Sequence, residues 1–247
     1  MTKPVLYIFA ISHYCEKARW ALDYLDIDFE IRHIAPGLHI ALAKKLGASA
    51  SSVPMLVADG QLVQGSAAII DWADAAASNS KRLTPQTGRE ECATLEKRLD
   101  DVIGIHIRRY YYSEALVEHP QTVKPIFTEN LGFLQKMLIG VTWGVVRKVM
   151  IKGMDLGAEQ GQDSKRIIEV ELEWLDGLLA DGRQFLTGQQ FSRADIAAAS
   201  LLAPLAAPSQ HPTYASIIMP PHVADDLVGW ENRPAINWVR EIYSQYR

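Results

Sequence analysis

Residues 5–34 constrain the fold most, because the hydrophobic periodicity changes twice within them. Residues 5–9 form a short apolar run of β-branched and aromatic side chains, which is typical of a buried strand. Apolar residues from Ala18 to Leu25 then recur at helical spacing, and residues 29–34 alternate between apolar and polar side chains as a half-buried strand does. Because a helical crossover allows two strands to pair in parallel, we predict a right-handed βαβ unit here.

Residues 36–77 predict the second half of the same sheet. A short irregular helix is expected over residues 36–47. Residues 53–58 and 61–64 predict two strands joined by the two-residue turn Asp59-Gly60, which is a strong hairpin signal. Ser66 precedes good helix formers, so we expect it to cap one further helix. The order of elements in residues 1–77 is therefore that of a thioredoxin-like domain.

The remainder of the chain predicts helices only. Residues 78–87 are polar and contain a proline, so we place a linker there. Helical periodicity then covers residues 90–112, 122–154, 164–180, 192–205 and 235–246. Ser192 and Asp195 have the spacing of a capping box at the start of one of these helices. We predict an α+β protein with a thioredoxin-like βαβ-ββα domain at residues 1–77 and an all-α domain at residues 88–247.

Composition narrows the classes of function. The 247 residues have a formal net charge of -4 and no dense cluster of Lys and Arg, which argues against a nucleic-acid binder. Two cysteines and seven histidines without ligand spacing predict neither a disulfide framework nor a metal site. The N-terminus does not have the pattern of a secretory signal, so we expect a cytoplasmic protein.

Residues 131–154 are the one stretch that raises the question of a membrane. Lys136, Arg147, Lys148 and Lys152 interrupt it before the roughly 18 apolar residues that a span needs. A helix lying at the membrane interface is an alternative, but a core helix of a helical domain is favoured. The sequence therefore argues against membrane contact.

The loop before the first predicted helix is the candidate site for chemistry. Ser12 lies where unpaired backbone N–H groups and the helix dipole stabilise an anion. A serine at this position also caps a helix without any further role, so both interpretations stay open. Cys15, in the first turn, is a possible second reactive group because such thiols often have a lowered pKa, although a buried packing role is the alternative.

Several motifs together resemble the cytosolic glutathione S-transferase family. They are Ser12-x-x-Cys15 after the first strand, Val53-Pro54 opening the third, and Gly-Ser-Ala-Ala-Ile at residues 65–69. The Ser-x-x-Asp of the predicted capping box and residues 232–236 are similar to segments of the family's helical domain. This resemblance implies glutathione as cosubstrate, a homodimer, and a serine at the catalytic loop position.

The resemblance also implies roles for individual residues. Ser12 would be the catalytic hydroxyl that donates to the glutathione thiolate. Val53 and Pro54, joined by a cis bond, would hold the tripeptide backbone, and Ser66 would bind the γ-glutamyl carboxylate. The family usually has an acidic residue immediately before that serine, whereas Gly65 stands here. Gln64 is a weaker substitute for the missing carboxylate.

The second substrate is expected to be a small hydrophobic electrophile. In the resembling fold the helix after the linker faces the active-site loop, so His106, Tyr110 and Tyr111 are the predicted wall of its pocket. A glutathione thiol has a pKa of about 8.5, and lowering it by about two units takes roughly 2.7 kcal/mol, which a hydroxyl donor and a helix dipole together supply. The predicted function is a glutathione transferase; the alternative is a non-catalytic ligand-binding or interaction protein on the same scaffold.

Overall fold

The computed structural model describes residues 2–78, 80–214 and 217–247, and its contacts divide the chain into two compact units. Unit 1 consists of Met1–Leu83 and Lys124–Lys148, and unit 2 consists of Thr84–Val123 and Val149–Arg247. The chain therefore passes from one unit to the other three times.

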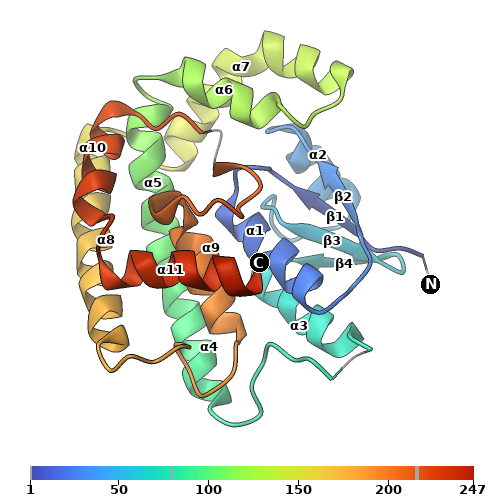
Figure 1. Ribbon diagram of the computed structural model, residues 1–247. Coiled ribbons are helices and arrows are strands. Elements are labelled where there is room, and N and C mark those ends of the chain that lie inside the picture. Colours follow the sequence, from blue (N-terminus) through green and yellow to red (C-terminus); the bar gives the residue numbers. More distant parts are fainter. Residues whose placement is uncertain (1, 79, 215–216) are drawn as a thin grey trace. The chain divides into compact units, whose positions relative to one another are not determined.

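Unit 1 contains a four-stranded sheet in the order β2-β1-β3-β4 (Figure 1). The strands are β1 (Val5–Ile8), β2 (Glu30–His33), β3 (Met55–Ala58) and β4 (Gln61–Gln64). β1 pairs in parallel with β2, while β3 pairs antiparallel with both β1 and β4. The helices of this part are α1 (His13–Tyr24), α2 (Leu38–Lys45) and α3 (Ser66–Ala76). The predicted thioredoxin-like order of elements is confirmed.

Local sequence explains this sheet. Leu6 and Leu56 are fully buried, and together with the apolar faces of α1 and α3 they form the core of the unit. Asp59 and Gly60, at the predicted hairpin turn, both have positive φ (48° and 80°). Two such residues give a turn whose twist matches that of the paired strands.

The prediction that Ser66 caps α3 is wrong by one position. Gly65 is the N-cap residue, with φ 93° and ψ 147°, and Ser66 is the first residue of the helix. The chain enters this helix through a backbone conformation that glycine adopts without strain, so the cap position falls on the glycine.

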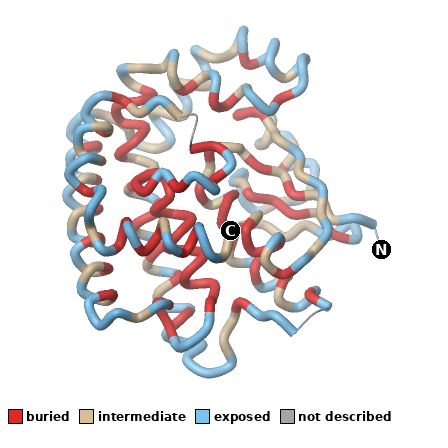
Figure 2. Tube along the Cα trace, viewed as in Figure 1, coloured by how far each residue is buried: buried red, intermediate tan, exposed pale blue. Residues whose placement is uncertain are grey.

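Residues 122–154 form two helices and not the predicted single one. α6 (Pro120–Thr128) and α7 (Phe133–Gly153) are separated by a turn in which the Leu131 amide donates to the Thr128 carbonyl at 3.1 Å. One face of α7 packs in unit 1, where Ile139 is buried and Trp143 is half-buried. The opposite face of the same helix is exposed along most of its length (Figure 2).

Unit 2 is helical. It contains α4 (Arg89–Arg98), the π-helical turn η1 (Leu99–Ile103), α5 (Gly104–Ala115), α8 (Ala158–Leu179), α9 (Arg193–Ala206), α10 (Pro221–Trp230) and α11 (Pro234–Tyr246). Every residue of α9 is buried, and this helix packs against α4, α5 and α11. The predicted helix over 90–112 is confirmed as α4, η1 and α5, whereas α10 was not predicted.

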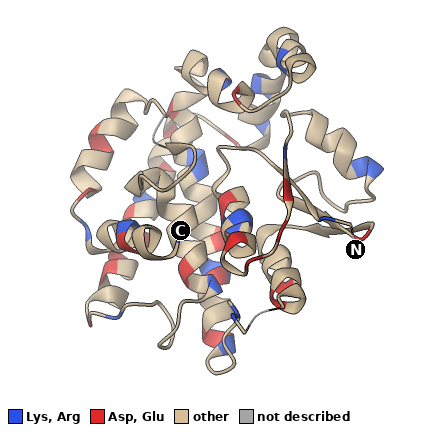
Figure 3. Cartoon of the chain, turned by 45° about the vertical axis from the view of Figure 1, so that its right-hand side comes forward, with Lys and Arg blue, Asp and Glu red and all other residues tan. Residues whose placement is uncertain are grey.

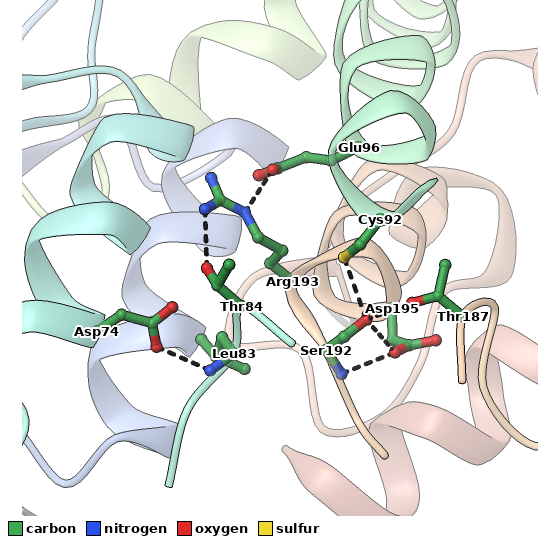
Figure 4. A network of polar contacts seen from close by, with 9 residues as sticks. All are labelled: Asp74, Leu83, Thr84, Cys92, Glu96, Thr187, Ser192, Arg193 and Asp195. Atoms are coloured by element: carbon green, nitrogen blue, oxygen red, sulfur yellow. Dashed lines mark hydrogen bonds and ion pairs between the residues drawn. The ribbon is translucent and has the colours of Figure 1, made fainter. Parts of the chain in front are cut away.

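The predicted capping box opens α9 (Figure 4). The carboxylate of Asp195 accepts from the Ser192 amide at 2.8 Å, from the Ser192 hydroxyl at 2.7 Å and from the Leu186 amide at 2.7 Å. Beside it, the guanidinium of Arg193 binds the carboxylate of Glu96 and donates to the Thr84 hydroxyl at 3.0 Å. These contacts fix the start of the central helix.

None of the helices in the described ranges has both the length and the apolar content needed to cross a bilayer.

Candidate functional site

Three loops of unit 1 meet at one edge of the sheet. The strand register pairs Tyr7 with Met55 and Met55 with Gln64, so the end of β1, the start of β3 and the end of β4 lie at the same edge. The loop with Ser12 follows β1, Pro54 precedes β3, and Gly65 follows β4. Residues that are more than fifty positions apart in sequence are thereby brought together, as are the N-termini of α1 and α3.

Ser12 is the N-cap residue of α1. Its backbone is extended, with φ -77° and ψ 116°, and its hydroxyl oxygen accepts from the Cys15 amide at 3.4 Å. This bond uses the oxygen as an acceptor only, so the hydroxyl proton remains available for donation to a ligand. The capping interpretation is confirmed, and it is compatible with a further role in binding.

Cys15 lies behind this loop with 1% of its surface exposed. Burial raises the pKa of its thiol to about 12, and the hydrogen bond with Ser12 offsets only part of that effect. Because only the thiolate is a strong nucleophile, a thiol that stays protonated at neutral pH is unreactive. The geometry therefore favours a packing role for Cys15.

The Val53-Pro54 peptide bond is cis, as the resemblance implied. The carbonyl oxygen of Pro54 accepts from the Gly65 amide at 3.0 Å. This hydrogen bond joins the loop before β3 to the first turn of α3. It fixes the cis-proline turn next to the N-terminus of α3.

The start of α3 carries Ser66, which is 6% exposed. No carboxylate precedes it in the chain, since Gly65 and Gln64 stand there. The side-chain amide of Gln64 donates to the carbonyl oxygens of Ala50 at 2.7 Å and Ser52 at 2.9 Å. Gln64 therefore holds the loop before the cis bond in place, and this uses both hydrogens of its side-chain amide.

Replacing Gln64 by Glu is expected to loosen this loop and to weaken binding at the site by about tenfold. The change removes both donors and places a carboxylate against two carbonyl oxygens, a loss of about 1 to 3 kcal/mol. Gln61→Glu, on the same strand and exposed, is the matched control. Calorimetric titration with glutathione measures the effect; equal affinities in the two variants would contradict this role of Gln64.

The predicted electrophile wall lies on α5 in unit 2. His106 Nδ1 is 3.2 Å from the Ser164 hydroxyl, and the Tyr110 hydroxyl donates to Asp226 at 2.6 Å. Burial raises the pKa of Tyr111 to about 12, and its hydroxyl has no hydrogen-bond partner among the described residues. Two of the three side chains are thus held by neighbouring helices of their own unit, and their contact with a substrate stays a prediction.

Sequence reasoning missed the residues from α6 and α7 that pack beside the Ser12 loop. The Phe9 ring, three residues before Ser12, is 5.9 Å from the ring of Phe127. A small pocket at the ends of β1 and β2 is lined by Ile8, Phe9, His33, Ile34, Ile126 and Phe127. The glutamine oxygen of Gln135 also accepts from the Ala35 amide at 3.0 Å. No periodicity or motif links residues so far apart, so the sequence offered no signal for this contact.

Across residues 2–78, 80–214 and 217–247, no three His, Cys, Asp or Glu side chains gather into a group that could hold a metal ion. The candidate site in unit 1 combines the Ser12 hydroxyl, a cis-proline turn and two helix N-termini.

Comparison with known families agrees with this architecture. Residues 6–81 match the family model described as glutathione S-transferase, N-terminal domain. The N-terminal domain of this chain belongs to the glutathione S-transferase family. No curated protein sequence gives a significant match over the chain.

Several solved structures share the fold over almost the entire chain. The enzyme GSTFuA2 from Phanerochaete chrysosporium is 16% identical, with a TM-score of 0.68 over 100% of this chain and 98% of its own. CsGST63524 of Ceriporiopsis subvermispora, solved in complex with glutathione, is 16% identical with a TM-score of 0.65 over 100% and 98%. The β-etherase LigF from Sphingobium sp. strain SYK-6 is 19% identical with a TM-score of 0.61 over 97% and 99%. At these identities the likeness establishes the fold.

Proposed function

We propose that the protein is a glutathione transferase that activates the glutathione thiolate for attack on a small hydrophobic electrophile. The observation that carries the proposal is the meeting of the Ser12 loop, the cis Val53-Pro54 turn and the N-terminus of α3 at one edge of the sheet. Membership of the N-terminal domain in the family and the fold shared with a glutathione complex support it.

Each part of the site has a distinct role in this proposal. The backbone of Val53, held beside the cis-proline, pairs with the cysteinyl part of glutathione. The hydroxyl of Ser66 and the amides that open α3 bind the γ-glutamyl carboxylate, because a helix N-terminus favours an anion. The tripeptide thiol then lies at the start of α1, next to Ser12.

The chemical step follows from the hydroxyl proton that Ser12 has free. Its O–H donates to the sulfur and favours the thiolate, and the dipole of α1 adds to the same effect. The thiol proton leaves to solvent, the sulfur forms a bond to the electrophilic carbon, and a leaving group departs where the substrate has one. Cys15, held as a buried thiol, takes no part.

Replacing Ser12 by Ala is expected to lower kcat/KM for a generic aromatic electrophile by about 10- to 100-fold. Loss of the donor raises the pKa of the bound glutathione thiol by about one to two units, so less thiolate is present at neutral pH. The thiol pKa is read from the ultraviolet absorbance of the thiolate as pH is varied. Cys15→Ala is the control and should leave both values unchanged.

An unimpaired Ser12→Ala variant would contradict the assignment of the hydroxyl. Loss of activity in Cys15→Ala with retention in Ser12→Ala would transfer the role to the cysteine. Both variants need a check of folding by circular dichroism, because Ser12 also caps α1 and Cys15 is a core residue.

A non-catalytic ligand-binding or interaction protein on this scaffold is the second candidate. It is favoured by the start of α3, where no carboxylate precedes Ser66 and Gln64 is engaged with the loop at Ala50 and Ser52. Retention on immobilised glutathione combined with an absence of turnover over a panel of electrophiles would support it. Retention together with Ser12-dependent turnover would exclude it.

A further inference from the structure

One face of α5 is held by other helices of unit 2. His106 Nδ1 lies 3.2 Å from the Ser164 hydroxyl of α8, and the Tyr110 hydroxyl donates to Asp226 of α10 at 2.6 Å. The Ser113 hydroxyl accepts at 3.3 Å from the backbone amide that precedes α8. Positions 106, 110 and 113 therefore mark the face of α5 that packs against α8 and α10.

Arg108 and Tyr111 lie on the opposite face of α5. They are three positions apart, so their side chains are neighbours on the helix surface. The Nε atom of Arg108 and the hydroxyl of Tyr111 are both buried, and neither has a hydrogen-bond partner among the described residues. Tyr111 is 7% exposed and Arg108 is half-buried. Two adjacent buried donors are thus left unsatisfied by the protein itself.

Arg108 also differs in charge pairing from other half-buried arginines of unit 2. Basic and acidic residues are interspersed along the helices of this unit (Figure 3). Arg98 binds Glu171 at 2.9 Å, and Arg233 binds Asp176 at 2.8 Å. Arg108 forms no ion pair with any described residue. A cation that is partly removed from water without a counter-ion is unfavourable, which indicates that an anion from outside the chain completes this face.

The local electrostatics agree with this interpretation. Burial raises the pKa of Tyr112 far above its ordinary value, Tyr111 adds to the rise, and the charge of Arg108 lowers it in part. Burial alone raises the pKa of Tyr111 to about 12, so its hydroxyl stays protonated and able to donate at neutral pH. No carboxylate of the described residues contributes to either shift. The face therefore offers two donors and one positive charge.

We propose that this face of α5 binds the carboxylate of an aromatic acid. A carboxylate only accepts hydrogen bonds, and its two oxygens match a guanidinium and a phenol. A single cation neutralises a monoanion, whereas a phosphate dianion would keep one charge unpaired. The rings of Tyr111 and Tyr112, whose centroids are 5.1 Å apart, place aromatic surface beside the same donors, and aromatic rings pack well against one another.

The identity of this acid as the second substrate rests on the proposed function. It narrows the class of electrophile from any small hydrophobic molecule to an aromatic one that carries a carboxylate. Binding of the acid is a property of unit 2 and needs neither Ser12 nor glutathione. Binding and turnover are therefore tested separately.

The binding test uses para-nitrobenzoate and its neutral counterpart para-nitrobenzamide, titrated calorimetrically into the full chain. Arg108→Met should raise the Kd for the acid by about 10- to 30-fold and Tyr111→Phe by about 3- to 10-fold, while binding of the amide stays unchanged. Arg109→Met removes a cation from the face that packs on α8 and is the matched control; it should leave both Kd values unchanged. Absence of saturable binding of the acid to the wild type, or equal Kd values for Arg108→Met and the wild type, would overturn the proposal.

The turnover test compares para-chloro-meta-nitrobenzoate with the corresponding benzamide. In both, the glutathione sulfur forms a bond to the same ring carbon and chloride leaves. The wild type should have the higher kcat/KM for the acid, and Arg108→Met should lower the acid-to-amide ratio by about tenfold. Ser12→Ala should slow both substrates and keep the ratio. An unchanged ratio in Arg108→Met would overturn the proposal. A wild type that binds the acid through Arg108 and converts neither compound would support the carboxylate site and contradict the transferase function.

Discussion

Replacing Arg193 by Ala is expected to lower the free energy of unfolding by about 3 to 5 kcal/mol, the cost of leaving a buried charge without its partner. The side chains of Arg193 and Glu96 are 9% and 5% exposed, and the guanidinium also donates to Thr84 (Figure 4). This contact joins the first residue of the buried α9 to α4, so its loss affects the centre of unit 2. Urea unfolding followed by circular dichroism measures the change.

A second substitution separates the ion pair from simple packing. Glu96→Gln in the Arg193→Ala background removes the stranded carboxylate and should recover a substantial part of the loss. Arg166→Ala, which breaks an ion pair with Asp163 at 70% and 50% exposure, should cost no more than about 1 kcal/mol. Equal decreases in the free energy of unfolding for Arg193→Ala and Arg166→Ala would show that burial does not determine how much these ion pairs contribute to stability.

Replacing Asp195 by Asn is expected to cost about 3 kcal/mol near pH 5 and less near pH 7. The substitution turns one acceptor into a donor that faces the amide or hydroxyl of Ser192, and it breaks the capping box. Burial raises the pKa of Asp195 from 3.8 to about 6, although hydrogen bonds to its carboxylate, among them those from Leu186 and Ser192, lower it in part.

The pH dependence follows from the direction of that shift. A folded-state pKa above the unfolded value means that the folded protein holds this proton more tightly, so stability from Asp195 is lost as pH rises from about 4 through about 6. The wild type loses this stabilisation at neutral pH, whereas the asparagine variant never has it. The difference in the free energy of unfolding between the two proteins is therefore smaller near pH 7 than near pH 5. Urea unfolding of both proteins at the two pH values tests this. Asp176→Asn, which removes the cap at the start of α11, is the control. A difference in the free energy of unfolding between wild type and Asp195→Asn that grows with pH would contradict the prediction.

The sequence predicted those parts of the fold that depend on local interactions. Alternation over residues 29–34, the Asp59-Gly60 turn and the Ser192-Asp195 spacing each determine a structure within a few residues, and each is confirmed. The sequence did not predict the break between α6 and α7. Helix-forming residues continue on both sides of it, and only a short turn, closed by the hydrogen bond from the Leu131 amide to Thr128, separates the two helices. α10 was missed because Pro220 and Pro221 suggest a loop, although proline is well tolerated at the first position of a helix.

The candidate site was predictable only in part for a related reason. Ser12, Pro54 and Ser66 belong to motifs, and strand pairing places their loops at one edge. The neighbours that pack against that edge, such as Phe127 and Gln135, are selected by tertiary contact, and a lone aromatic or glutamine carries no mark of its distant partner. The hydrogen bonds of Gln64 to Ala50 and Ser52 likewise join residues that no sequence motif connects.

The threefold passage of the chain between the units affects how the protein is made. Unit 1 is completed only by Lys124–Lys148, which supply Phe127, Gln135 and Ile139 to its packing. During synthesis, the thioredoxin-like sheet therefore emerges from the ribosome well before the helices that cover Ala35 and Phe9. Domains usually fold as they emerge, N-terminal part first. Here Phe9 and Ala35, which follow β1 and β2, stay without the packing of Phe127 and Ile139 until Lys124–Lys148 has been translated. Unit 1 therefore completes its packing only after Thr84–Val123 of unit 2 has been made.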